Sequence, residues 1–147
     1  MIKRMMFRIV PLVLLTLMFT GCASDKDKKL IEAAGRGDVA LVGQLIDQGA
    51  SIDAVALDDW TPLTRAATEG HLDVVRLLLA KGADVNKPIG DISPLFFAAN
   101  YGHTPIVKVL LAHGALLNLP QANREAFVAR LKAHNDPELM RILLEQF

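Results

Sequence analysis

The 147-residue sequence contains one cysteine, one tryptophan and one tyrosine, and its formal net charge at pH 7 is zero. A single cysteine excludes an internal disulfide framework and any zinc site built from several thiolates. The zero charge argues against a general nucleic-acid-binding protein, which carries a marked excess of Lys and Arg. Yet 52% of the residues are hydrophobic, which is more than an ordinary soluble domain of this size has. One part of the chain must therefore carry the excess.

The excess hydrophobicity lies in residues 1–21. This segment contains Lys3, Arg4 and Arg8, no acidic residue, and an apolar run over residues 9–20. A positive start, a short apolar run and small residues at its end are typical of a secretory signal peptide. The run is shorter than the roughly 20 residues that a membrane-spanning helix needs, so a retained membrane helix is the less favoured alternative. Without this segment, 13 basic residues face all 16 acidic ones, and the net charge becomes −3.

Cys22 lies directly after this segment, between Gly21 and Ala23. The arrangement resembles a bacterial lipobox, in which a cysteine after a small residue is acylated, for example with palmitate, and becomes the new N-terminus. Phe19 departs from the leucine that is usual there. The resemblance implies a lipid anchor, which is stable because more than one acyl chain is attached. Ala23 after the cysteine implies sorting to the outer membrane of a Gram-negative cell, with the protein facing the periplasm.

Two alternatives to lipidation stay open at Cys22. Gly21-Cys22-Ala23 also fits an ordinary cleavage site between small residues, which releases a soluble periplasmic protein. In the second alternative, Cys22 is an unmodified thiol in a retained anchor.

Short motifs recur along the rest of the chain at spacings of 32 and 33 residues. They are Gly49-Ala50, Gly82-Ala83 and Gly114-Ala115; Gly37-Asp38, Gly70-His71 and Gly102-His103; and Thr61-Pro62-Leu63 and Ser93-Pro94-Leu95. A fixed period of this length is typical of repeat proteins. The best copy, residues 59–86, is similar to the ankyrin repeat along its whole length. That resemblance implies an all-α solenoid of about four stacked helix-turn-helix units, joined by short hairpin-like fingers.

The residues of the best copy favour the same local structure. Thr61 offers a capping hydroxyl before Pro62 at the first helical position. Gly70 can adopt the left-handed conformation that ends a helix. The second predicted helix, residues 72–79, is apolar nearly all round, so neighbouring repeats must cover it.

We expect the repeat domain to span residues 30–147, with repeats at about 28–54, 55–87, 88–119 and 120–147. The first and last repeats lack the Thr-Pro motif and are predicted to be caps, which a short solenoid needs for solubility. Residues 22–29 are expected to form a polar tether. Such a tether keeps the repeats within about 27 Å of the lipid anchor.

The four histidines are expected to be structural. His71 and His103 match the family's Gly-His position, where the ring makes local hydrogen bonds. His113 and His134 lie near helix ends, where a cation interacts favourably with the helix dipole. The four positions form no metal-ligand spacing. The histidine of the family's Thr-Pro-Leu-His motif is replaced by Thr64 and Phe96, so the usual hydrogen-bond network between repeats is not expected.

No catalytic residue, metal ion or cofactor is predicted. The sequence has no Gly-x-Ser-x-Gly motif and no phosphate-binding glycine loop. Asp58 and Asp59 are adjacent in a predicted finger, where both are expected to be solvated. Asp59 stands at a turn position that often holds glycine, and Asp tolerates left-handed geometry better than most residues.

The resemblance implies a protein-binding face made of the fingers and the first helix of each repeat. Twelve residues are predicted to project from it: Val55, Leu57, Asp58, Trp60, Arg65, Glu69, Lys87, Ile89, Asp91, Ile92, Asn100 and Tyr101. Trp60 and Tyr101 belong to residue types that are enriched in interface hot spots. In the alternative interpretation, Trp60 packs over the adjoining finger. Phe97 is expected to lie in the core.

The leading hypothesis is a lipid-anchored, non-catalytic envelope protein that binds a protein partner in or near the membrane and no nucleic acid. A scaffold, an accessory of a periplasmic enzyme and an immunity protein against a toxin all fit, and the oligomeric state stays open. One different hypothesis is an enzyme or ligand-binding protein with an unrecognised site, which requires a deep polar pocket with perturbed pKa values. Another is a purely structural envelope protein.

Overall fold

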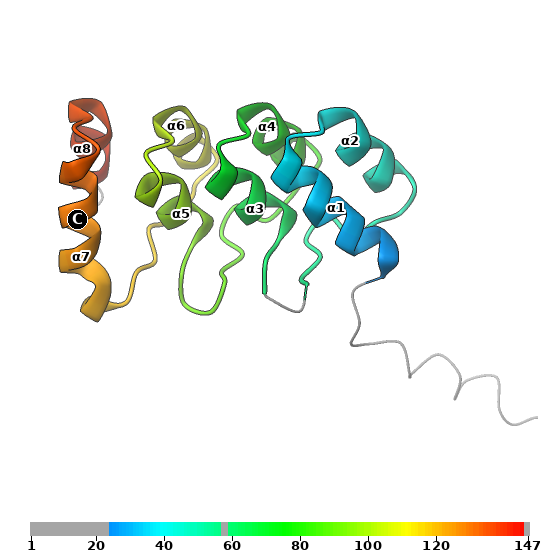
Figure 1. The fold of residues 1–147 in the computed structure, drawn as a ribbon, viewed down its shortest axis with the longest axis horizontal. Coiled ribbons are helices and arrows are strands. Elements are labelled where there is room, and N and C mark those ends of the chain that lie inside the picture. The colour runs from blue at the N-terminus through cyan, green and yellow to red at the C-terminus, as the bar shows by residue number, and fades with distance from the viewer. Residues whose placement is uncertain (1–23, 57–58, 146–147) are drawn as a thin grey trace, which may run out of the picture.

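The computed structural model describes residues 24–56 and 59–145, where the chain forms eight α-helices and one short 3-10 helix. The predicted signal peptide 1–21, Cys22, Leu57 and Asp58 lie outside the described residues. Four helix pairs stand side by side, and the loops between the pairs all project to the same side (Figure 1). This arrangement confirms the predicted all-α repeat solenoid.

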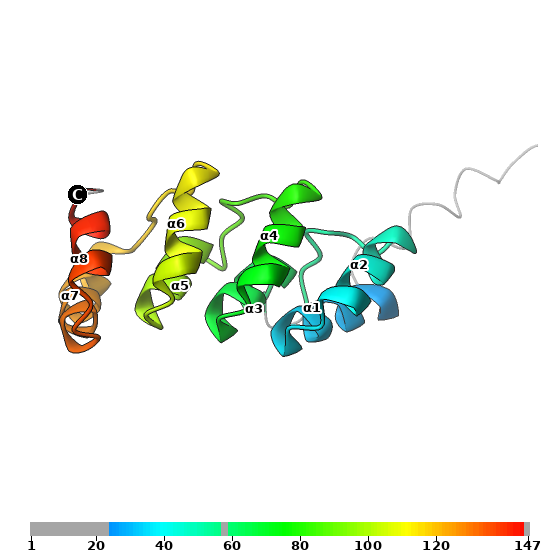
Figure 2. The same cartoon turned by 90° about the horizontal axis from the view of Figure 1, so that it is seen from above.

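The helices pair in chain order. The pairs are α1 (Asp25–Arg36) with α2 (Val39–Asp47), α3 (Pro62–Glu69) with α4 (Leu72–Ala80), α5 (Pro94–Asn100) with α6 (Thr104–Ala112), and α7 (Arg124–Ala133) with α8 (Pro137–Leu144), with the 3-10 helix η1 (Gln121–Asn123) before α7. The first helices form one row and the second helices a row behind it (Figure 2). No described helix has the length and apolar character needed to cross a membrane.

The predicted caps of α3 and α5 are present. The backbone N–H of Thr64 donates to the hydroxyl of Thr61 at 3.1 Å, and that of Phe96 donates to the hydroxyl of Ser93 at 3.4 Å. Each hydroxyl stands before a proline in the first turn of its helix, where the missing N–H costs no hydrogen bond. Gly70 ends α3 in the left-handed conformation, with φ 87°. The local signals of the Thr-Pro and Ser-Pro motifs therefore determine where these helices begin.

The structure corrects the predicted tether over residues 22–29, because α1 already begins at Asp25. Ser24 and Asp27 form a reciprocal capping box, with Asp27 N–H to Ser24 Oγ at 3.2 Å and Ser24 N–H to Asp27 Oδ2 at 2.9 Å. Asp27 Oδ1 also accepts the N–H of Ser51 at 2.7 Å. Burial raises the pKa of Asp27, but the N–H groups of Ser51 and Ser24 outweigh it and hold that pKa below its ordinary value.

One continuous core runs through all four pairs. The first helices contribute Leu30, Leu63, Leu95 and Phe127 at one register position, and the second helices contribute Leu45, Leu78, Leu110 and Leu143 at another, all of them buried. Pairs of buried alanines, such as Ala66 and Ala67 in α3, lie where adjacent first helices meet. Each pair thus buries its apolar faces only against its neighbours, which is the energetic basis of a solenoid.

Three histidines join consecutive repeats. The Nε2–H groups of His71, His103 and His134 each donate, at 2.9 Å, to a backbone carbonyl near the end of the preceding first helix, on Gly35, Thr68 and Asn100 respectively. The bonds of His71 and His103 are therefore between repeats, and not local as the sequence predicts. The first repeat has Asp38 at this position, where it caps α2 through the N–H of Leu41.

His134 corrects a second prediction, because it does more than place a cation near a helix end. Its ring repeats the bond of His71 and His103, although the Gly-His motif is absent there. Asn135 follows it with φ 50°, a left-handed residue that turns the chain into α8. His113, in contrast, bonds locally, with Nδ1 2.8 Å from the carbonyl oxygen of Val109.

Asp136 links the last two repeats through a side chain. It caps α8 by accepting the N–H groups of Glu138 at 2.9 Å and Leu139 at 3.1 Å, and it also accepts the hydroxyl of Thr104 at the start of α6. The Thr104 hydroxyl is the largest cause that lowers the pKa of Asp136 below its ordinary value, followed by the N–H of Leu139. The folded state therefore favours the charged carboxylate.

The histidine ring leaves no room for a side chain on the glycine beneath it. A Cβ on Gly70 would lie 2.7 Å from Cε1 of His103, whereas a Cβ on Gly82 would meet nothing within 4 Å. Both glycines are left-handed, with φ 87° and 92°. We expect Gly82→Ala to cost about 1 kcal/mol from backbone strain alone. We expect Gly70→Ala to cost about 1–2 kcal/mol more, because the His103 bond is lost as well. Urea denaturation measures both free energies.

The same pair of alanine variants in a His103→Ala background provides the control. There the two substitutions should cost equal amounts, because the ring is gone. Equal costs in the wild-type background would contradict the role of the histidine in stacking.

The lowered pKa of Asp136 predicts a pH dependence of stability. A carboxyl whose folded pKa is depressed stabilises the fold above its unfolded pKa, near 3.9, and loses that contribution as the pH falls through the folded value. Asp136→Asn keeps a capping side chain without the charge. We expect the stability advantage of the wild type over Asp136→Asn to be constant from pH 7 to about pH 5 and to shrink below about pH 4. Urea titrations across this range measure it.

Thr104→Val is the matched variant, because it removes the largest cause of the shift. In that background, the pH dependence of the Asp136→Asn difference should become smaller. A difference that does not change with pH in the wild-type background would contradict the assignment.

Candidate binding face

The predicted binding residues lie on α3, on α5 and in the loops before them. We call the surface formed by the first helix of each pair and the loop before it the groove face. In Figure 1 it comprises the row α1, α3, α5 and α7 together with the loops that project beneath them. Of the predicted residues, Leu57 and Asp58 lie outside the described residues.

The finger before α3 is a tight turn over residues 56–60. The N–H of Ala56 donates to the carbonyl of Trp60 at 3.2 Å, and the N–H of Asp59 donates to the carbonyl of Ala56 at 3.0 Å. Asp59 has φ 62°, which agrees with the left-handed geometry expected at this glycine-like position. Val55, at the start of the turn, is 40% exposed. This finger therefore presents an apolar side chain and an acidic tip to solvent.

The finger before α5 ends in a two-residue hairpin. Ile89 and Ile92 form an isolated antiparallel bridge, with N–H to carbonyl distances of 2.9 and 3.0 Å in the two directions. Gly90 makes the turn possible with φ 55°. Asp91 at the tip is exposed, whereas the isoleucines and Lys87 are half-buried. The predicted hairpin-like shape is confirmed for this finger.

Trp60 packs on the next repeat, and its contacts differ from both sequence interpretations. Its ring lies 5.2 Å from the ring of Phe97 in α5, at an interplanar angle of 52°. The guanidinium carbon of Arg65 lies 5.2 Å from the centroid of the Trp60 ring, a cation–π distance. Trp60 is half-buried, so part of the ring stays accessible. Its packing partner is therefore a helix and not the adjoining finger.

Phe97 is half-buried on this surface, which corrects its predicted place in the core. Its ring meets Phe96 edge to face at 5.5 Å, and Phe96 lies 4.9 Å from Phe127 of α7. Phe96 stands where the family has a histidine, and it joins two repeats by apolar contact instead of a hydrogen bond. Thr64, at the same position of its repeat, shares a hydroxyl hydrogen bond with Thr61 at 2.9 Å. The row of aromatic rings thus replaces part of the expected polar network.

Arg65 lies at the edge of an open groove between α1 and α3. The groove has a volume of about 670 Å³ and is lined by Lys28, Ile31, Glu32, Gly35, Arg36, Ala56 and Arg65. The side chain of Arg65 crosses Gly35 so closely that a Cβ there would lie 2.9 Å from Arg65 Cγ. Glycine at position 35 therefore makes space for the arginine.

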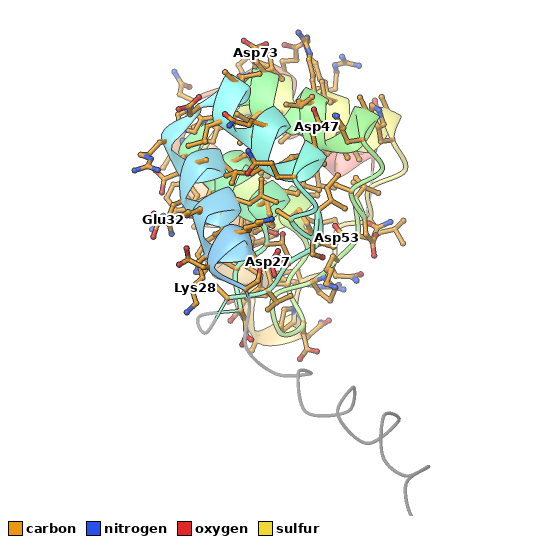
Figure 3. All side chains as sticks on the ribbon, turned by 90° about the vertical axis from the view of Figure 1, so that its right-hand side faces the viewer. Asp27, Lys28, Glu32, Asp47, Asp53 and Asp73 are labelled. Carbon is orange, nitrogen blue, oxygen red and sulfur yellow. The ribbon has the colours of Figure 1, made fainter. Side chains whose placement is uncertain are left out.

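The sequence analysis missed the contribution of α1 to this groove. Glu32 and Arg36 stand 33 residues before Arg65 and Glu69, so they occupy the same register positions of the first repeat. Lys28 and Glu32 lie on neighbouring turns along one side of α1 (Figure 3). The repeat period could have identified them. The polar composition of residues 24–29, interpreted as a tether, drew attention away from α1.

The predicted set does not form one patch. Trp60 and Arg65 are in contact, and Arg65 lies 3.9 Å from Glu69 in a loose ion pair. Tyr101 ends α5 and is 50% exposed, and it is separated from the Ile92 finger by a helix about 10 Å long. Asn100 supplies the carbonyl that His134 binds. Tyr101 and Asn100 therefore belong to a different region of the groove face.

Among residues 24–56 and 59–145, no group of three or more His, Cys, Asp or Glu side chains is arranged to hold a metal ion. In the same ranges, the pKa values of Asp27 and Asp136 are lowered, and both carboxylates serve as helix caps.

Two family models match the chain. A model of ankyrin repeats in three copies matches residues 11–89, and a model of a single ankyrin repeat matches residues 91–121. Helices α7 and α8 lie beyond the matched residues, so the last repeat is evident from the structure.

Curated proteins with similar segments come from mammals. The 2-5A-dependent ribonuclease of Mus musculus is 46% identical over 66 residues, which is 43% of this chain and 9% of that protein. Ankyrin repeat, SAM and basic leucine zipper domain-containing protein 1 of Equus caballus is 44% identical over 59 residues, 40% of this chain and 12% of that protein. The protein of the same name in Nomascus leucogenys is 40% identical over 62 residues. The chain spans about a tenth of the length of these relatives.

The contacts of Trp60 predict that it contributes to stability. Trp60→Ala removes the Phe97 and Arg65 contacts, and we expect the free energy of unfolding to fall by about 1–2 kcal/mol. Tyr101→Ala removes a ring that is 50% exposed and should change stability by less than about 0.5 kcal/mol. Urea denaturation of both variants measures the difference. Equal effects of the two substitutions would contradict the packing of Trp60 on α5.

Proposed function

Because the chain belongs to the ankyrin-repeat family, we propose that it is a non-catalytic protein-binding module, held at a membrane of the bacterial cell envelope by a lipid on Cys22. Ankyrin repeats are protein-interaction scaffolds, and the coarse part of this function follows from the family. The open groove between α1 and α3, with Arg65 and the half-exposed Trp60 at its edge, carries the proposal. These side chains project from rigid helices and leave the core intact.

The early start of α1 strengthens the argument for a partner close to the membrane. The capped helix begins at Asp25, so only Ala23 and Ser24 separate it from Cys22. Two or three residues span about 10 Å at most, whereas the predicted eight-residue tether reaches about 27 Å. A repeat stack attached at Cys22 therefore stands directly against the bilayer. Its partner is a membrane protein or a protein bound at the same surface.

The first helix also supplies cations beside the anchor. Lys26, Lys28 and Lys29 lie in the first turns of α1, where Asp25 and Asp27 accompany them. Lys26 is held by the carbonyl of Gln48 at 3.0 Å, and Lys29 pairs with Asp25 at 2.7 Å. The local charge is nearly balanced, so the lipid on Cys22, and not electrostatic attraction to the bilayer, is the proposed anchor.

A scaffold, an enzyme accessory and a toxin-immunity protein would all use the same face. They differ in the partner and not in the chemistry of the repeats. We therefore state the function at the level they share, which is the binding of a protein at the membrane surface.

Replacing Cys22 by Ser tests the anchor. We expect the wild-type protein in the membrane fraction of a bacterial host, labelled by radioactive palmitate, and the Cys22→Ser variant unlabelled and outside the membrane fraction. A variant that stays in the membrane would instead indicate a retained N-terminal helix. A wild-type protein that is soluble and unlabelled would indicate ordinary signal cleavage.

A photo-reactive amino acid at position 69 tests protein binding in the same cells. Glu69 is exposed on the groove face beside Arg65, and Arg76 is exposed on α4 in the second row. We expect light to produce a cross-linked protein from position 69 and not from position 76. Absence of any adduct from position 69, with the protein folded and anchored, would contradict the proposed function.

A further inference from the structure

The groove between α1 and α3 has a charge opposite to that of the chain around it. Lys28, Arg36 and Arg65 line it, with Glu32 as the one acidic residue among its lining residues. The lining therefore carries an excess of two positive charges. The sequence after residue 21 has a net charge of −3. A positive groove on an acidic domain attracts negative groups specifically to this place.

Arg65 is held ready to bind a carboxylate. Its stem lies across Gly35, and its guanidinium carbon is 5.2 Å from the Trp60 ring centroid. The carboxylate of Glu69 is 3.9 Å from Nε, beyond the 2.7–3.2 Å of an N–H···O hydrogen bond. The guanidinium can thus donate to an incoming carboxylate in the bidentate geometry that arginine favours. Because its stem is already packed, binding orders little more of the side chain.

The remaining lining suits a peptide. Ile31 and Ala56 add apolar surface between the charged groups, so aliphatic side chains fit beside the acidic ones. The carboxylate of Glu32 can accept a hydrogen bond, and a peptide backbone supplies N–H donors for it. A phosphate diester has no such donor and would be repelled by Glu32. The mixture of three cations, one acceptor and apolar walls therefore favours a polypeptide over a phospholipid headgroup.

We propose that this groove binds a segment of the partner protein in which acidic and aliphatic residues alternate, with Arg65, Arg36 and Lys28 holding its carboxylates. This inference rests on the proposed protein-binding function and adds the chemistry of the partner. The groove is the part of the groove face nearest the N-terminus of α1, so the acidic segment lies close to the membrane when the chain is anchored at Cys22.

Three dye-labelled, terminally blocked hexapeptides test the chemistry. One alternates Glu with Leu, one Gln with Leu, and one Lys with Leu, and fluorescence anisotropy measures their binding to the purified protein. We expect the Glu peptide to bind about tenfold or more tightly than the Gln peptide, and the Lys peptide to bind most weakly. Raising NaCl from about 20 to about 300 mM should reduce the preference for Glu, because exposed charges are screened.

Single substitutions assign the preference to the groove. Arg65→Gln and Arg36→Gln should each weaken binding of the Glu peptide about five- to tenfold, and leave binding of the Gln peptide unchanged. Glu32→Gln should strengthen binding of the Glu peptide about two- to fivefold, because it removes the repelling carboxylate. Arg76→Gln is the matched control, since this arginine is also exposed and also lies 3.9 Å from a carboxylate, that of Asp73. It should change nothing.

Equal affinities for the three peptides would overturn the proposal, and so would equal effects of Arg65→Gln and Arg76→Gln. Vesicles of anionic phospholipid, added as a competitor, distinguish the other source of negative charge. If they displace the Glu peptide while Arg65→Gln abolishes vesicle binding, the groove binds lipid and the inference is wrong. An adduct from position 69 combined with no peptide preference would refute only the acidic partner. Absence of an adduct would refute the protein-binding function itself.

Discussion

Everything in this structure depends on the burial of each helix pair by its neighbours. The apolar residues of α4 and α6 cover nearly the whole helix surface, so neither helix is stable unless pairs stand on both sides. The column of buried leucines from Leu45 to Leu143 is continuous for this reason, and small alanines let the first helices approach. The exact repeat of about 33 residues is the consequence, because a shift of register would expose this column.

Polar groups that the stacking would otherwise leave unpaired serve as links between repeats. His71, His103 and His134 each satisfy a carbonyl at the end of the preceding first helix. Among the described residues, no buried side-chain polar atom lacks a hydrogen-bond partner. Because the stack supplies its own satisfaction, the loops and the outer sides of the first helices are free to vary. The groove face is built on those positions, which explains how Trp60 and Arg65 can project without weakening the core.

Much of the fold was predictable, and the errors share one cause. The period, the Thr-Pro caps, the left-handed Gly70 and the terminal capping repeats all follow from local signals. The start of α1 was missed because the Ser24–Asp27 capping box lies in a segment whose polar composition is typical of a linker. His134 was missed because its neighbours no longer form a Gly-His pair. Trp60 and Phe97 were misplaced because their contact joins residues 37 positions apart, and no local pattern encodes such a pair.

The sequence alone determined the repeat, its handed turns and the division into leader and repeat domain, because spacing, capping and composition are properties of neighbouring residues. Only the tertiary structure decided which side chains meet across repeats. The groove exists because α1 is a full helix beside α3, so that Arg65 crosses Gly35 and joins Lys28 and Arg36. Those contacts span about 30 residues and depend on the distance between stacked helices, which the sequence specifies only through packing.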